Sequence, residues 1–66
     1  MSLSALRRLD CEIVLELLER RPQGATVDEI QHETQLRHGP VQLALLQLHW
    51  ANRAKFLRES QVWVAV

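Results

Sequence analysis

Apolar side chains recur at helical spacing along the first third of the chain and predict a helix over about 4–21. Ser2 or Ser4 can cap its first turn, and Pro22 and Gly24 break it at the other end. One stripe of this helix belongs to the core: Leu6, Leu9, Ile13 and Leu17, with Leu3 and Val14 at its edge. A second apolar stripe, a third of a turn or more away, holds Cys11, Leu15 and Leu18.

A second helix has a strong start signal at Thr26. Glu29 follows three residues later and can reach back to the amide of Thr26, which is the pattern of a capping box. This pair predicts a helix over about 27–34. Leu36 then lies in the turn, where an apolar side chain can fill the angle between two helices.

The third helix is expected over about 38–52, because Pro40 is tolerated only in a first turn. Asn52 can take the left-handed conformation that ends a helix. The core side carries Val41, Ala44, Leu45 and Leu48. The opposite side is apolar as well, and a helix that is apolar on both sides is expected to be covered on both. We therefore expect a partner to contact Leu43, Leu46 and Trp50.

The end of the chain is rich in β-forming residues. The runs 55–58 and 62–65 predict an antiparallel hairpin with Glu59-Ser60 between them, which Ala25-Thr26 could join as a short strand. The pattern thus predicts a mainly α protein with a small β-hairpin, an α+β fold. Its three helices and two-stranded wing form a single domain over 1–66.

Composition narrows the class of protein. The chain is 47% apolar, which argues against disorder, and its 8 basic residues balance 8 acidic ones. With one cysteine it cannot form an internal disulfide, so a reducing cytoplasm is the expected compartment. No run approaches the roughly 20 apolar residues of a membrane span or the apolar length of a signal peptide, so we expect a soluble protein that is not exported. A domain of this size has a thin core, so oligomerisation is expected.

Candidate chemistry is sparse. Zinc-type ligands are present but lack paired spacing such as Cys-x-x-Cys, so we expect neither a metal site nor a cofactor; they are Cys11, His32, His38 and His49. No Gly-rich phosphate loop and no isolated carboxylate pair is evident. We therefore do not expect an enzyme.

From Thr26 to Val66 the chain resembles the winged helix-turn-helix domain of small bacterial and archaeal transcription regulators. The resemblance rests on helix caps and apolar spacing. It implies a dimeric DNA-binding regulator whose third helix enters the major groove and whose wing, 58–61, touches the DNA backbone. The residues expected to contact double-stranded DNA are Arg37, His38, Gln42, Gln47, Arg53, Lys55 and Arg58.

Two hypotheses of different classes therefore remain. The first, favoured because it is the commonest use of the fold, is the DNA-binding regulator, with Cys11, Leu15 and Leu18 at a homodimer interface. In the second, the same scaffold is a protein-interaction or dimerisation module without DNA binding. It then docks through the apolar outer face of the third helix.

Overall fold

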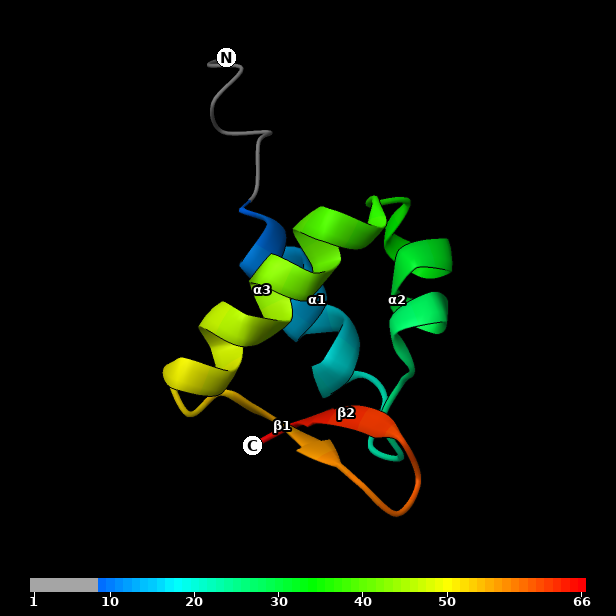
Figure 1. Cartoon of the computed structure of the whole chain (residues 1–66), viewed down its shortest axis with the longest axis vertical. Coiled ribbons are helices and arrows are strands. Elements are labelled where there is room, and N and C mark those ends of the chain that lie inside the picture. Colours follow the sequence, from blue (N-terminus) through cyan, green and yellow to red (C-terminus); the bar gives the residue numbers. More distant parts are fainter. Residues whose placement is uncertain (1–8) are drawn as a thin grey trace.

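The computed structural model describes residues 9–66. Three helices and one antiparallel hairpin follow one another along the chain (Figure 1): α1 (Asp10–Glu19), α2 (Val27–Thr34), α3 (His38–Trp50), β1 (Ala54–Leu57) and β2 (Val62–Ala65). The fold is mainly helical with a small β-hairpin and has a winged-helix-like layout. The predicted fold class is confirmed.

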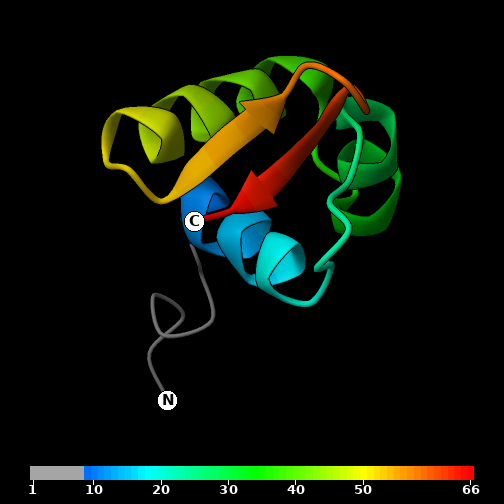
Figure 2. The same ribbon diagram turned by 90° about the horizontal axis from the view of Figure 1, so that it is seen from below.

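The core draws on every element. α1 packs against α2, α3 and β2, and the hairpin closes one end of the helical layer, as the view from below shows (Figure 2). The buried side chains come from the three helices, from β1 and from the segment before α2: Val14, Leu17, Leu18, Ala25, Ile30, Val41, Ala44, Leu45, Leu48 and Ala54.

The second helix starts as its capping box predicts. The Glu29 amide donates to Thr26 Oγ1 at 3.1 Å, and the Thr26 amide donates to Glu29 Oε1 at 2.8 Å. The bounds of α2 match the predicted 27–34. Leu36 packs against the core in the turn that follows, as expected.

The predicted short third strand is present at Ala25. Its amide donates to the Trp63 carbonyl at 2.9 Å, and the Trp63 amide donates back to the Ala25 carbonyl at 2.8 Å. Within the hairpin, Phe56 lies opposite Trp63. The segment before α2 is thereby tied to β2.

The first helix begins later than predicted, at Asp10. Leu9 is its N-cap, with extended backbone and 65% exposure, and its amide donates to Glu12 Oε1 at 3.1 Å. Leu9 precedes the first turn of α1, so its side chain does not follow the helical spacing of the predicted stripe. The prediction that Leu9 belongs to the core is therefore wrong. The other early positions of that prediction lie outside the described residues: Ser2, Leu3, Ser4 and Leu6.

Leu18 is only 1% exposed and belongs to the core, so its assignment to a partner interface is wrong. Cys11 and Leu15 of the same stripe are half-buried and pack against that core. The reason is that α1 has neighbours in α2, α3 and β2. A helix with several packing partners buries a wider apolar face than a helix on one surface does.

The third helix buries its predicted core side, Val41, Ala44, Leu45 and Leu48. It ends at Trp50, and Asn52 has the expected left-handed conformation with φ of 60°. The hairpin turn spans 58–61, longer than the two residues expected, and the Gln61 amide closes it on the Leu57 carbonyl at 2.8 Å. Arg58 therefore lies in the turn.

Candidate functional site

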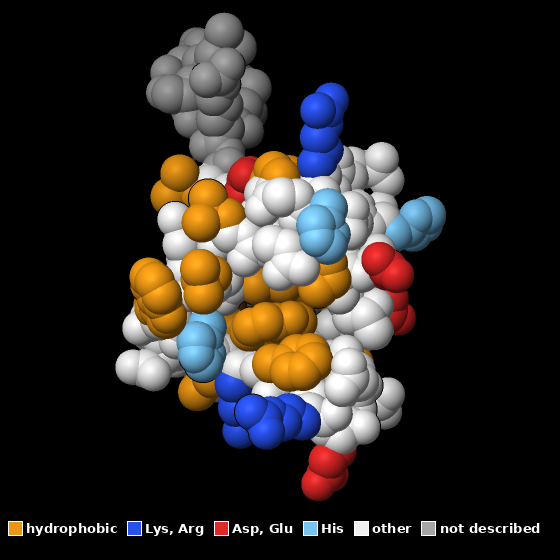
Figure 3. Space-filling model, in the orientation of Figure 1, with side chains coloured by type: hydrophobic (Ala, Val, Ile, Leu, Met, Phe, Trp, Pro, Cys, Tyr) orange, Lys and Arg blue, Asp and Glu red, His pale blue; other side chains and the backbone are white. Residues whose placement is uncertain are grey.

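The outer side of α3 is apolar and open to solvent. Leu43 is 57% exposed, Leu46 43% and Trp50 76%. Hairpin aromatics continue this surface, which we call the outer apolar face: Leu43, Leu46, Trp50, Phe56 and Trp63. In Figure 3, orange side chains form a band across α3 and the hairpin. Patches of contiguous apolar side chains on a small protein mark interaction sites.

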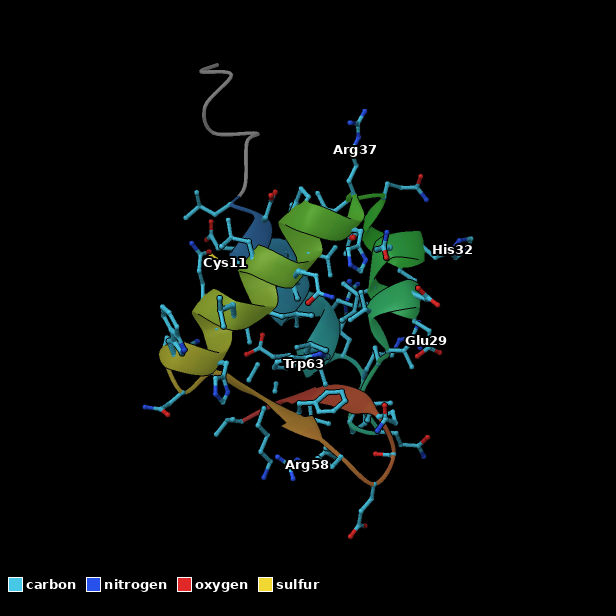
Figure 4. The ribbon with its side chains drawn as sticks, in the orientation of Figure 1. Cys11, Glu29, His32, Arg37, Arg58 and Trp63 are labelled. Atoms are coloured by element: carbon cyan, nitrogen blue, oxygen red, sulfur yellow. The ribbon has the colours of Figure 1, made fainter. Side chains whose placement is uncertain are left out.

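Trp63 forms the centre of this face. Its ring lies 5.4 Å from that of Phe56 and meets the His49 ring edge-on at 6.3 Å, as centroid distances. Figure 4 shows it between α3 and the hairpin. A depression of about 350 Å³ opens beside it, lined by Gln42, Leu43, Leu46 and Trp63. The strand that carries this indole is anchored, because the Trp63 amide donates to the Ala25 carbonyl and the Trp63 carbonyl accepts from the Ala25 amide.

Sequence reasoning missed Phe56 and Trp63 as members of this face. Alternation places Phe56 on the same side of β1 as the buried Ala54 and so indicates a core position, whereas the residue is 39% exposed. The pairing of Phe56 with Trp63 then brings both rings together. That pairing depends on the hairpin register, which needs the turn length to be known.

Two residues predicted to contact DNA at the start of α3, His38 and Gln42, are hydrogen-bonded to each other. His38 Nδ1 lies 3.2 Å from Gln31 Oε1, and Gln42 Nε2 lies 3.3 Å from His38 Nε2. Because an amide oxygen only accepts, Nδ1 donates to Gln31 and Nε2 accepts from Gln42. Arg37 stands beside this chain at the N-cap of α3. Gln31, His38 and Gln42 thus form one polar cluster.

The basic side chains of the hairpin lie elsewhere. Figure 4 shows Arg37 and Arg58 at opposite ends of the molecule, with Trp63 between them. Lys55 is exposed on β1, and Arg53 lies just before it. Arg37 and Arg58, two of the predicted DNA-binding residues, therefore lie far apart on either side of Trp63.

Gln47 lies on a different side of α3 from Gln42. Five residues advance a helix by about 140° beyond a full turn. Gln47 accordingly lines a groove of about 440 Å³ between α1 and α3, floored by Leu15 and Leu48 and bordered by three glutamates: Glu12, Glu16 and Glu19. Arg53 lines the same groove. Gln42 and Gln47, both expected to contact DNA, therefore lie on different sides of α3.

Charge is segregated along the chain and hence over the fold. Seven of the eight acidic residues lie within α1 and α2, from Asp10 to Glu33, and the remaining one is Glu59. The basic side chains after α2 are Arg37, Arg53, Lys55 and Arg58. In Figure 3, blue side chains border the apolar band at the hairpin. Basic residues therefore lie on the hairpin side of the outer apolar face, whereas on the α1 side Asp10 lines a depression together with Leu43.

The acidic elements are held by local interactions. The backbone hydrogen bond from Thr26 lowers the pKa of the Glu29 carboxyl below its usual 4.5. Arg21, just after α1, forms an ion pair with Glu33 of α2. These contacts position α2 and contribute no reactive group. Within residues 9–66, no cluster of three or more His, Cys, Asp or Glu side chains could hold a metal ion.

Comparison with known proteins does not assign this chain to a family. No protein-family model matches this chain, and no curated protein or solved structure is significantly similar to it. None of the helices in the described part of the chain has the length and apolar character that crossing a membrane requires.

Proposed function

We propose that this chain is a protein-interaction module that docks another polypeptide on its outer apolar face and has no catalytic role. The observation that carries the proposal is the exposure of Leu43, Leu46 and Trp50 on one side of α3. The depression beside Trp63 supports it, because large apolar and aromatic side chains around a pocket are typical anchors of protein interfaces.

DNA reading by the same helix is the less supported alternative. A recognition helix offers hydrogen-bonding side chains to base edges, whereas the middle of the outer side of α3 offers Leu43 and Leu46. Placing it in the major groove would bury these leucines against polar base edges. Arg37, His38 and Gln42 lie at the start of α3, before these leucines in the sequence. DNA binding by the seven predicted residues stays a prediction.

The test is site-specific photo-crosslinking in the cells that make the protein. A photoreactive amino acid at position 50, within the outer apolar face, should form an adduct with a defined polypeptide. The same amino acid at position 28, on the exposed side of α2, is the matched control. The adduct should disappear when Leu46→Glu is added. Crosslinking of position 50 to DNA, or to no defined chain, would contradict the proposal.

A second measurement addresses the alternative directly. Fluorescence anisotropy of labelled random duplex DNA at low salt detects even non-specific binding. We expect no binding by the wild-type protein. Duplex binding that weakens in Arg37→Ala and Gln42→Ala, while Leu46→Glu has no effect, would support the regulator hypothesis instead.

A further inference from the structure

We infer that the polypeptide that docks on the outer apolar face is a second copy of this chain, and that Trp50 of each copy fills a hollow on the other. This inference rests on the proposed function and names the partner. The two α3 helices then pack antiparallel about a twofold axis.

The face carries a projection near one end of α3 and a hollow near the other. Trp50 is the most exposed of the large apolar side chains in residues 9–66, at 76%. Near the start of α3 a hollow of about 480 Å³ has apolar walls from Leu9, Pro40 and Leu43, and Asp10 also lines it. We call it the N-terminal hollow. A surface that holds both a projection and a hollow able to receive it is self-complementary, as a closed twofold dimer requires.

The spacing along α3 makes this contact reciprocal. Leu43 and Trp50 are seven residues apart, so they lie on one side of the helix, about 10.5 Å apart along its axis. In two copies of a helix that pack antiparallel about a twofold axis, the residue numbers of facing positions have a constant sum. If Trp50 faces Leu43 of the other copy, Leu43 therefore also faces the other Trp50, and Leu46 lies beside the axis. One arrangement fills both hollows.

The chemistry of the N-terminal hollow suits a buried tryptophan. Its leucine and proline walls cover the apolar ring, and an indole N–H that leaves water needs an acceptor. The Asp10 carboxylate provides one, and ionised acceptors form stronger hydrogen bonds than neutral ones. The depression beside Trp63 is smaller, about 350 Å³, and its polar lining residue is the neutral Gln42, which is hydrogen-bonded to His38. The N-terminal hollow is therefore the better seat for Trp50.

The area available is sufficient for a specific dimer. Such an interface buries at least about 1000 Å² in total, or about 500 Å² per copy. This is about a tenth of the 5077 Å² surface of the chain. An indole that is 76% exposed supplies roughly 110–190 Å² of it. Leu9, Leu43 and Leu46, which are 43–65% exposed, and the polar rim supply the remainder.

Sedimentation equilibrium of the full chain, from micromolar to millimolar concentration, tests for the dimer. We expect a monomer–dimer equilibrium in the wild type. Trp50→Ala and Leu46→Glu should each weaken dimerisation at least about tenfold, because each removes a central apolar contact. Gln23→Glu adds a carboxylate at an exposed position before α2 and should leave the dimerisation constant unchanged. Circular dichroism confirms that each variant is folded.

A double-mutant cycle tests the proposed hydrogen bond between copies. Trp50→Phe removes the indole N–H and Asp10→Asn removes the charge of the acceptor. If the two groups meet across the interface, Asp10→Asn should weaken dimerisation of the wild type severalfold and have little further effect in Trp50→Phe. Additive effects of the two changes would exclude Asp10 as the acceptor.

Nuclear Overhauser effects between copies locate the indole. In a sample mixed from ¹³C-labelled and unlabelled chains, isotope filtering retains only contacts between different copies. We expect effects between the Trp50 ring of one copy and the Leu43 methyl groups of the other. Effects between Trp50 and Trp63 of the other copy, without any to Leu9 or Leu43, would refute the N-terminal hollow as the seat.

The outcomes separate this inference from the proposed function. A wild-type chain that stays monomeric at millimolar concentration would overturn the second copy as the partner, as would a dimer that Trp50→Ala and Leu46→Glu leave intact. If the crosslink at position 50 then joins a monomeric chain to a different polypeptide, the docking face stands and only the second copy is rejected. An adduct with twice the mass of the chain supports both.

Discussion

Gly24 shows how one residue position can depend on the whole sheet. Its backbone has φ of +88°, where L side chains are rare, and an added Cβ would lie 2.7 Å from Val62 Cγ2 and 2.8 Å from the Trp63 carbonyl oxygen. The close approach exists because the neighbouring Ala25 is bonded to Trp63. A glycine that looks like a simple helix breaker in the sequence therefore also allows the turn to pass close to β2.

Gly24→Ala should consequently destabilise the fold by roughly 1–3 kcal/mol through backbone strain, with a further contribution from the clash with β2. Gly39→Ala is the matched control, since nothing lies within 4 Å of its Cβ position in α3. That change should be neutral or stabilising by up to about 1 kcal/mol. Urea unfolding followed by circular dichroism measures both. Equal stability of the two variants would contradict this account of Gly24.

Leu18 and Leu43 are leucines with opposite environments. Leu18→Ala leaves a cavity in the core and should cost about 2–5 kcal/mol of unfolding free energy. Leu43→Ala removes a side chain that is mostly in water and should change stability by less than about 0.5 kcal/mol. Thermal and urea denaturation provide the comparison. A large loss in Leu43→Ala would mean that this leucine is covered in the folded protein.

Among the elements, α2 depends most directly on its cap. The fold places Glu29 where its carboxylate accepts the Thr26 amide, and this hydrogen bond favours the charged form. The helix dipole favours the same charged form, because Glu29 lies in the first turn of α2. The start of α2 should therefore be the most acid-sensitive part of the helical layer.

The direction of the pH effect on stability follows from the linkage between proton binding and folding. Because the folded pKa of Glu29 is below its unfolded value of 4.5, the carboxylate stabilises the fold above that value, and the contribution is lost as pH falls through the folded pKa. Glu29→Gln should lower stability at about pH 7 and have less effect at about pH 3. Denaturation at a series of pH values measures the difference. A wild-type to variant gap that stays constant with pH would refute the role of the charge.

At the scale of the whole molecule, the small core and the exposed outer apolar face belong together. A chain of 66 residues buries a limited core. A partner that binds only the folded state adds stability in proportion to the logarithm of its concentration over Kd. Docking is therefore expected to stabilise this domain appreciably.

A polypeptide that docks on the outer apolar face, at about 100 times its Kd, should add roughly 2.7 kcal/mol and raise Tm by about 10 °C or more in a domain this small. Calorimetry or a circular dichroism melt detects the shift. Leu46→Glu should melt at the same temperature with and without that polypeptide. An equal rise in Leu46→Glu would show that the polypeptide binds elsewhere.

Local chemistry in the sequence was sufficient for much of this fold. The capping box of Thr26 and Glu29 gave the start of α2, and Asn52 marked the exit from α3, because these signals act within a few residues. The spacing of Val41, Ala44, Leu45 and Leu48 predicted the buried side of α3 and therefore the exposed one. That side of α3 is half of the candidate site.

Tertiary packing decided the rest. Leu18 is buried because α1 packs against several elements at once, and the periodicity of one helix does not state how many neighbours it has. Phe56 and Trp63 join the outer apolar face through strand register, and Gln47 turns toward α1 because its side of α3 faces that helix. Contacts within one turn of helix are encoded locally, whereas contacts between elements depend on how distant segments pack together.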